Sequence, residues 1–560
     1  MWFRKVLPCW WIIFVVAARC EEIVSDEEYA TIPDVFYQDN FDKCMMRKEK
    51  AHFCSFSYKL EPLDHTKPPE MWRIIKARVQ NPIRKMTPSH QYQVGTIFSI
   101  YLAFVLFASF YEGYKRNWIR LKTVNSTHEI ERLRCIQGMR LYNTALVVFS
   151  HTALSLISGP VANARYPESL HENVARLIFS SGPLCVGTFF LFSTFLLSNG
   201  LFDHLRDKKT LDLKLILFVI FNRIFRLTPT VLVVVLFHAT WLRHLGNGPW
   251  WNDFVGYEYQ KCRMNGWTNL IYINNWYDTF VMCLPVTWYL ALDTQYFVMA
   301  LFFISFLKSH EKYLYWIIGG TMSVIFVTTF IQNYYHDFSG LILPIPEYFY
   351  GMRNLLGSFQ FHYQVGSFIG NLSPAVAGIG IGYYFCNHKN DSPDQYIFRT
   401  KCRQTLWWWC TFIIALLFLI IPGSMILNYE AAHDRFWASM YVAISRPLFA
   451  FIIGTGLIGF SEGIGWLAVR VTNWPPTYVL GRLTFSVYLI HMSINLITPA
   501  ILRYSAYVND YVTVTKFLGD IFFIYIIATL LALFVELPVS QLQKIIFKQP
   551  GTKKKVDKEE

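Results

Sequence analysis

The sequence predicts an all-α, polytopic membrane helical bundle of about 11 (10–12) transmembrane helices, preceded by a signal peptide and a short lumenal segment. Of its 560 residues, 53% are hydrophobic and only 16% are charged, whereas a soluble domain has about 25% charged residues. Apolar runs long enough to cross a bilayer recur along the chain. Lysines and arginines gather beside these runs, as the positive-inside rule describes.

The N-terminus predicts a signal peptide over residues 1–20. A basic start precedes an apolar stretch from Val6 to Val16, and two small residues follow it. A signal anchor is the alternative, although the stretch is short for a span. Residues 21–93 then form a polar lumenal or extracellular segment, in which Cys44 and Cys54 can pair in an oxidising compartment.

The apolar runs predict eleven spans. The first lies in residues 94–129, together with a basic cytosolic linker. A short run at 373–386 and an aromatic stretch at 334–368, which can hide a re-entrant segment, leave the count open by one or two. The expected spans are 94–111, 141–158, 182–199, 219–241, 286–307, 313–331, 373–386, 405–427, 440–460, 478–499 and 515–535.

The basic linker after the first span sets the predicted topology, because it puts the N-terminus in the lumen or outside the cell. An odd number of spans then puts the basic tail, 546–560, in the cytosol. It also puts Cys262 and Cys283 together in a lumenal loop, where a disulfide can persist. We therefore expect a multi-pass integral membrane protein of the endomembrane system or the plasma membrane.

The composition also argues against two kinds of partner. The net charge of +13 does not predict nucleic-acid binding, because the 51 Lys and Arg residues lie mostly in short clusters beside apolar runs. The eleven cysteines show no CxxC spacing, and the candidate histidines lack neighbouring carboxylate or cysteine ligands, so no metal is expected. Membrane lipids are the predicted surroundings.

His151 is the best catalytic candidate, because ionisable side chains inside apolar runs are costly and few. It follows Arg140 by eleven residues, so both project from nearly the same helix face, roughly 16 Å apart along the axis. An uncharged imidazole in a protein cavity suits a base that takes a proton from a hydroxyl while the oxygen attacks an acyl carbonyl. The alternative is a core histidine that donates to a backbone carbonyl or to a neighbouring hydroxyl.

Arg223 and Arg226 are predicted to bind anions. They stand three residues apart in FNRIFRLTP, hence on one helix face near the cytosolic boundary, at the depth of Arg140. Guanidinium groups in that position can grip phosphates, and cytosolic CoA would fit. The alternative is that both arginines snorkel to lipid headgroups.

Other polar residues at membrane depth are weaker candidates. Asp293 and Gln295 interrupt the apolar run WYLALDTQYF, and Asp293 can orient a histidine or pair with an arginine. Tyr488 and His491 stand three apart on one face, so His491 is a second base or a structural donor. Glu536 lies at the predicted cytosolic end of the last span.

Six stretches carry a resemblance. They follow one another in the order QGMRLYNTALVVFSHT, VGTFFLFSTFLLS, FNRIFRLTP, WTNLIYINNW, CLPVTWYLALDTQYF and LGRLTFSVYLIHMS. Together they resemble acyltransferase family 3, the multipass membrane acyltransferases, and within it the nose-resistant-to-fluoxetine-like proteins of animals. The resemblance covers residues 130–545.

The resemblance implies acyl transfer from cytosolic acyl-CoA, the co-substrate, to a hydroxyl acceptor. It assigns the catalytic role to His151 and the CoA phosphates to the RxxR element of Arg223 and Arg226. Three places depart from the family pattern: the aspartate before TFF (188–190) is Gly187 here, the Ser-Gly after it is Ser193 and Thr194, and the aspartate before the Gly-x-Arg element is Gln137.

Two functions therefore follow from the sequence. The first is a membrane-embedded O-acyltransferase with His151 as general base, Asp293 as an orienting or substrate-binding group, and a lipid, glycan or small molecule as acceptor. In this function three arginines bind the anionic acyl-CoA: Arg140, Arg223 and Arg226. The second is a non-catalytic relative that uses the same cavity to transport lipids or small hydrophobic molecules. An inverted-repeat transporter is less expected, because no matching pair of broken spans is found.

Overall fold

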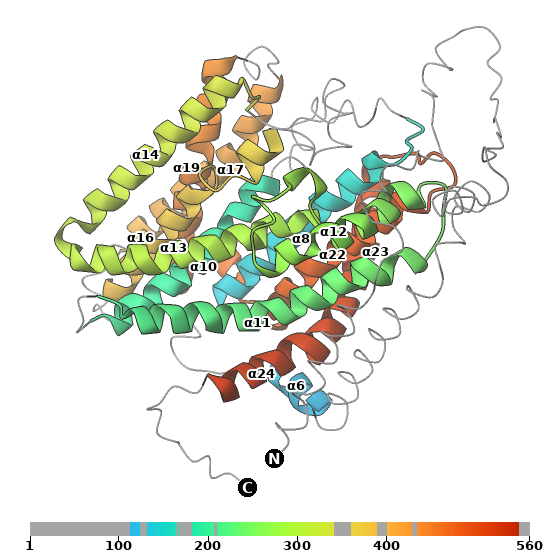
Figure 1. The fold of residues 1–560 in the computed structure, drawn as a ribbon. Coiled ribbons are helices and arrows are strands. Elements are labelled where there is room, and N and C mark those ends of the chain that lie inside the picture. Colours follow the sequence, from blue (N-terminus) through green and yellow to red (C-terminus); the bar gives the residue numbers. More distant parts are fainter. Residues whose placement is uncertain are drawn as a thin grey trace, which may run out of the picture. The chain divides into compact units, whose positions relative to one another are not determined.

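A computed structural model describes residues 113–123, 132–163, 166, 182–206, 210–340, 360–388, 400–427 and 434–547 (Figure 1). The chain divides into two units, 1–104 and 105–560, and all described residues belong to the second unit. The predicted signal peptide, the 21–93 segment with Cys44 and Cys54, the span at 94–111 and the tail after residue 547 lie outside the described residues.

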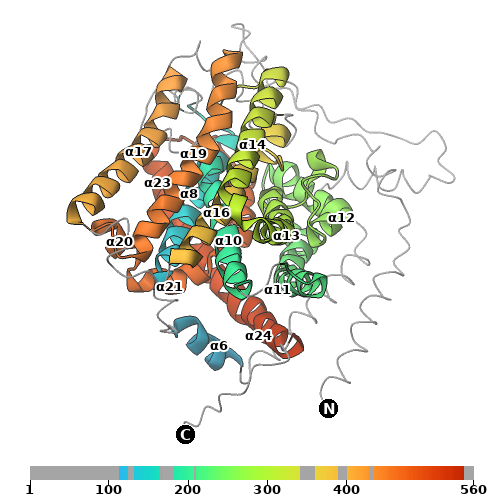
Figure 2. The ribbon, with the colours of Figure 1, turned by 90° about the vertical axis from the view of Figure 1, so that its left-hand side faces the viewer.

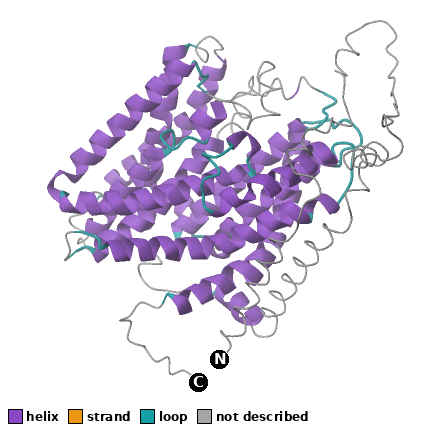
Figure 3. Cartoon of the chain, viewed as in Figure 1, coloured by secondary structure: helices purple, strands orange, loops and turns teal. Residues whose placement is uncertain are grey.

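Helices account for nearly all regular structure in the described residues, where one isolated bridge, Val161 with Ala506, is the other element (Figure 3). The long helices are α8 (Cys135–Ser158), α10 (Gly182–His204), α11 (Leu213–Thr240), α13 (Trp288–Ser309), α14 (Leu314–His336), α16 (Leu372–His388), α17 (Lys401–Leu427), α19 (Arg435–Ser461), α22 (Thr484–Ala500) and α23 (Asp510–Leu531).

Shorter elements connect or flank the long helices. Figures 1 and 2 both draw α6 and α24 close together, and these two helices are in contact. The short α-helices are α6 (Gly113–Lys122), α12 (Tyr257–Leu270), α20 (Leu467–Thr472), α21 (Pro475–Arg482) and α24 (Leu537–Ile546). Single π-helical segments are Asn252–Gly256, Phe361–Val365 and Ala532–Glu536, and the 3₁₀ turns are Leu242–His244, Thr279–Val281, Pro285–Thr287 and Glu311–Tyr313.

The all-α membrane bundle is confirmed. Each predicted apolar run within the described residues is helical along nearly its whole length. Among the described residues, seven helices are long and apolar enough to cross a membrane, and the number rises to eight when α21 and α22, bent by 65° at Leu483, count as one broken span. The count of eleven spans stays a prediction.

Burial separates the central helices from those that face lipid. In α10 and α13, 61% of the most apolar stretch of the helix is buried inside the protein, and in α19 the share is 67%. The buried share is only 17% for α14 and 28% for α11. Exposed apolar side chains on spanning helices contact hydrocarbon, where the helix satisfies its own backbone groups. The site residues must therefore lie on the inner faces of the bundle.

Small residues bring the central helices α10 and α16 into close contact. A side chain at Gly378 or Gly382 would collide with the backbone carbonyls of α10. At the same contact Thr194 Oγ1 donates to Ala375 O at 2.8 Å, and Ser198 Oγ donates to Ile379 O at 2.8 Å. Membrane helices commonly pack in this way, because small residues let backbones approach and hydroxyls bond across helices.

A second set of close contacts fixes α8 against α20 and the bent pair α21 and α22. A side chain at Gly138 would overlap the carbonyl oxygen of Thr472 at the end of α20, and one at Gly481 of α21 would meet the backbone of Gln137. Near the other end of α8, a side chain at Gly159 would meet Pro499 of α22 at 3.1 Å. Helices α8 and α22 therefore run in the same direction, and Arg140 and His151 lie on α8 between these contacts.

Replacement of Gly138 by alanine should destabilise the bundle, because the added methyl group meets backbone atoms that cannot rotate away. Overpacking of this kind costs about 1–3 kcal/mol, so Gly138→Ala should lower the melting temperature of the purified protein in detergent. Gly319→Ala is the matched control, since nothing lies within 4 Å of the added group in α14. Equal melting temperatures for Gly138→Ala and the wild type would contradict the close contact.

Candidate functional site

A cavity of about 260 Å³ lies among α8, α10, α11, α13 and α22, and the π-helical segment Ala532–Glu536 also contributes to it. Seven of the residues that the sequence singled out line it: Arg140, Arg223, Arg226, Asp293, Tyr488, His491 and Glu536. The other lining residues are Thr144, Val147, Val148, Val186, Phe189, Ser193, Leu227, Tyr289, Thr484 and Phe485. The cavity is therefore cationic and polar within an apolar wall.

Helical periodicity explains why two of the walls are continuous. On α8 the lining positions 140, 144, 147 and 148 follow one face of the helix, and position 151 is the next on that face. On α22 the lining positions 484, 485, 488 and 491 do the same. Because the helices are parallel, the two stripes lead to the same level, where His151 and His491 meet.

The two histidines are joined by a hydrogen bond. His491 Nε2 lies 3.1 Å from His151 Nδ1, and the two rings stack with centroids 5.1 Å apart. His491 Nδ1 lies 2.6 Å from the carbonyl oxygen of Tyr488. His491 is fully buried, and His151 is partly exposed. His491 lines the cavity and His151 does not. His151 lies directly behind His491, to which it is hydrogen-bonded.

The hydrogen bonds assign the protons when both rings are neutral. A carbonyl oxygen can only accept, so His491 Nδ1 carries a proton and donates it to Tyr488 O. His491 Nε2 is then bare and accepts from His151 Nδ1. This leaves His151 Nε2 as a bare nitrogen with a lone pair, which is the form that a general base requires.

At the other end of the cavity, one arginine is neutralised. Arg223 Nη2 donates to Asp293 Oδ2, and its guanidinium lies 4.2 Å from the ring centroid of Phe297. Arg140 and Arg226 have no carboxylate within ion-pair distance in the described residues, although Glu536 lies in the same lining.

The remaining polar candidates have other partners. Tyr488 donates its hydroxyl to Val286 O, and Glu536 accepts from Ser486 Oγ at 2.7 Å. Gln295 does not line the cavity; its amide donates to Tyr272 O at 2.9 Å and to Asn275 Oδ1 at 2.8 Å. Gln295 therefore holds the loop before α13.

That loop follows α12, and its fixed geometry supports α13. The predicted disulfide between Cys262 and Cys283 is confirmed. The Tyr272 hydroxyl lies 2.9 Å from Thr228 Oγ1 of α11. Burial raises the pKa of this hydroxyl, so Tyr272 stays protonated. The covalent and hydrogen-bonded anchors hold the start of α13, and hence Asp293, against α11.

Gly187 and Gln137, which depart from the family pattern, lie beside the cavity rather than in its lining, whereas Ser193 of the third departure lines it. A side chain at Gly187 would first meet Pro374 of α16, at 3.3 Å. Gln137 precedes the close contact of α8, and its buried Oε1 has no hydrogen-bond partner in the described structure. The absent carboxylate at 187 would therefore point toward α16.

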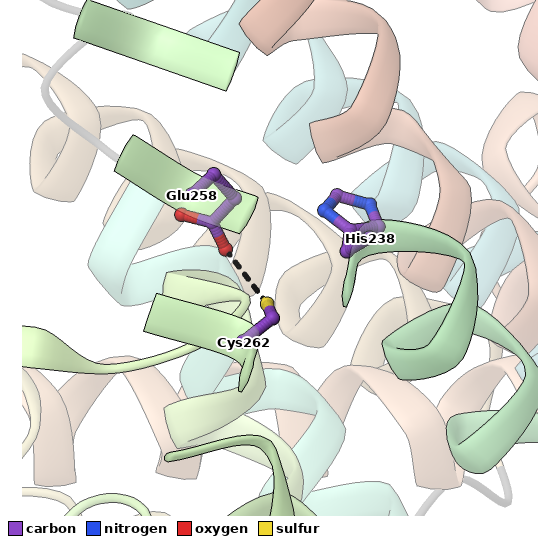
Figure 4. Close-up of side chains that lie close together, drawn as sticks. All are labelled: His238, Glu258 and Cys262. Carbon is purple, nitrogen blue, oxygen red and sulfur yellow. Dashed lines mark hydrogen bonds between the residues drawn. The ribbon is translucent and has the colours of Figure 1, made fainter. Parts of the chain in front are cut away.

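The structure also brings together three potential metal ligands that the sequence did not indicate, His238, Glu258 and Cys262, whose ligand atoms lie within 4.8 Å of one another (Figure 4). The Cys262 sulfur lies 3.4 Å from Glu258 Oε1, but it belongs to the disulfide and is not a thiolate. Glu258 already contacts Lys261 Nζ at 2.7 Å and accepts from Leu284 N at 2.6 Å. The oxidised protein therefore offers a polar network here, and the trio does not fit a metal.

The fold and the cavity define a multi-pass helical membrane protein with an internal cationic site. Residues 133–537 match the family described as acyltransferase domain, so the chain belongs to acyltransferase family 3 and is a membrane acyltransferase-like protein. Nose resistant to fluoxetine protein 6 of Caenorhabditis elegans is 24% identical over 476 residues, which are 79% of this chain and 54% of that protein. The chain thus spans about half the length of the curated relative that it matches. No solved structure matches it.

Replacement of Asp293 by asparagine should destabilise the protein, because it leaves the partly buried Arg223 charge without its partner. Breaking a fully buried ion pair costs about 3–5 kcal/mol, and the loss here should be smaller because the Arg223 side chain is 20% exposed. The double variant Asp293→Asn, Arg223→Gln should melt at a higher temperature than Asp293→Asn alone, since no unpaired charge remains. Additive losses in the double variant would show that the two side chains do not interact.

Proposed function

We propose that the protein is an acyl-CoA-dependent O-acyltransferase in which His151 is the general base. One observation carries the proposal: a single cavity extends from three arginines to His491, which is hydrogen-bonded to His151. The arginines would bind the phosphates of CoA, and the pair would act at the thioester. Membership of acyltransferase family 3 supports the same reaction class.

The proposed donor site uses the two arginines that have no carboxylate within ion-pair distance in the described residues. Arg140 and Arg226 would contact the CoA phosphates, because guanidinium groups bind phosphate oxygens with charge-assisted hydrogen bonds. Arg223, held by Asp293, would shape the entrance. The predicted topology puts these residues on the cytosolic side, where acyl-CoA is found.

The proposed chemistry needs one proton transfer in each direction. The acceptor hydroxyl gives its proton to His151 Nε2, while its oxygen forms a bond to the acyl carbonyl carbon. The thioester C–S bond then breaks, and the CoA sulfur takes the proton from the imidazolium. His491 would hold His151 in the tautomer with a bare Nε2, the role that an orienting group has beside a catalytic histidine.

The alternative is a non-catalytic carrier of lipids or small hydrophobic molecules. One observation favours it: His151 does not itself line the cavity, whose wall includes several apolar side chains. A carrier needs the cavity and no bare nitrogen at its end.

If His151 is the general base, replacement of His151 by alanine should lower the rate of acyl transfer by a factor of about 100 or more. The assay supplies radiolabelled acetyl-CoA to protein reconstituted in lipid nanodiscs with lipid and glycan extracts, and follows label in the acylated product. Folded His151→Ala protein with wild-type transfer would refute the proposal. If no label moves even with wild type, while the variant still rescues a loss-of-function phenotype, the carrier is favoured.

Replacement of His491 should act through His151. In His491→Leu the partner that fixes the tautomer is lost, so kcat should fall by roughly 100-fold with the KM for acyl-CoA unchanged. His491→Gln, which offers an amide oxygen to His151 Nδ1, should recover part of the rate. Nitrogen-15 NMR of histidine-labelled protein should show a proton on His151 Nδ1 in the wild type, with the signal assigned from the His151→Ala spectrum. A wild-type proton on Nε2 would contradict the assignment.

A further inference from the structure

A layer of polar side chains continues the two cavity walls beyond the histidine pair. On α8 the next residue on the face of His151 is Ser155, and on α22 the next on the face of His491 is Asn495. Both side chains are buried, with 7% of Ser155 and 2% of Asn495 exposed. Neither residue lines the cavity that contains the arginines.

The register of the helices puts Ser155 and Asn495 at one level. His151 meets His491, and eight residues later on each helix Gly159 meets Pro499. In two parallel helices that make contacts eight residues apart on each helix, the residues four positions after the first contact also lie at the same height along the two axes. Ser155 and Asn495 therefore share a layer one helical turn past the histidines.

The polar atoms of this layer lack partners in the described structure. Ser155 Oγ and both amide atoms of Asn495 make no hydrogen bond. Neighbouring hydroxyls on the same helices behave differently: Ser158 Oγ donates to Leu154 O at 2.6 Å, and Thr498 Oγ1 donates to Ile494 O at 3.2 Å. An unpaired amide buried in a membrane bundle is costly, so the layer is suited to a guest that hydrogen-bonds.

We propose that Ser155 and Asn495 form the acceptor subsite, which holds the acceptor's hydroxyl beside His151 on the side away from the arginines. This inference rests on the proposed function and specifies its second substrate. Asn495 offers both a donor and an acceptor, and Ser155 adds a hydroxyl. The acceptor is therefore an alcohol that carries a second hydrogen-bonding group next to the reacting hydroxyl.

The subsite separates the two substrates. Acyl-CoA approaches His151 from the arginine end of the cavity, and the acceptor lies in the Ser155–Asn495 layer. The acceptor's oxygen loses its proton to His151 Nε2 and bonds to the acyl carbon, and CoA leaves as the free thiol. A hydrogen-bonding subsite discriminates strongly against an alcohol that lacks the second polar group, because its own polar atoms then stay unpaired.

The test compares two probe alcohols in nanodiscs with labelled acetyl-CoA, 1,2-propanediol and 1-propanol. The wild-type protein should acetylate the diol with a kcat/KM at least about tenfold higher. Asn495→Leu and Ser155→Ala should each reduce this preference toward unity, with the KM for acetyl-CoA unchanged. Thr498→Val and Ser158→Ala are matched controls on the same helices, since their hydroxyls bond to their own backbone, and they should keep the preference.

Thermal unfolding gives a second readout that does not need catalysis. Because Asn495 has no partner to lose, Asn495→Leu should melt at the wild-type temperature or above it. A marked loss of stability would assign Asn495 a structural role and overturn the subsite. If the wild type acetylates the alcohols and Asn495→Leu keeps the same preference for the diol, the subsite is also overturned, and water rather than the acceptor would occupy the layer. No acetylation by wild type would overturn the proposed function together with the subsite.

Discussion

The cost of a charge in hydrocarbon governs this structure. Arg140, Arg223 and Asp293 lie on spanning helices, and each faces the inside of the bundle, because contact with lipid tails would cost at least about 2.5–3.5 kcal/mol per residue. Their burial in turn requires helices that approach closely enough to seal them. The contacts at Gly138 and Gly378 supply that approach.

The same cost explains why the cavity has two different ends. At the arginine end three cations share the lining with two carboxylates, Asp293 and Glu536, and one of the cations is ion-paired in the described residues. At the histidine end the described groups are imidazoles, hydroxyls and an amide, which offer hydrogen-bonding capacity. A charged donor and an uncharged acceptor are matched to these ends in the proposed reaction.

Much of the fold and part of the site were predictable from the sequence, for identifiable reasons. Apolar runs predict spanning helices because the solvent is apolar, and the eleven-residue step placed Arg140 and His151 on one face before any tertiary contact was known. The meeting of His151 with His491 depends on how α8 packs against α22, which periodicity within one helix does not contain. Gln295 was expected at the site, but it satisfies the backbone carbonyl of Tyr272, since loop geometry is not encoded by hydropathy.

The substitution of the family aspartate by Gly187 has a limited effect on the proposed chemistry. A side chain at 187 would meet Pro374, in the contact between α10 and α16, before it reached the histidine pair. The group that orients His151 here is the neutral His491, which accepts one hydrogen bond and is itself fixed by Tyr488 O. A neutral orienting partner fixes the tautomer without stabilising an imidazolium as a carboxylate does. In the proposed reaction the protonated form of His151 is therefore less stable than it would be beside a carboxylate. It gives its proton more readily to the CoA sulfur when the thioester breaks.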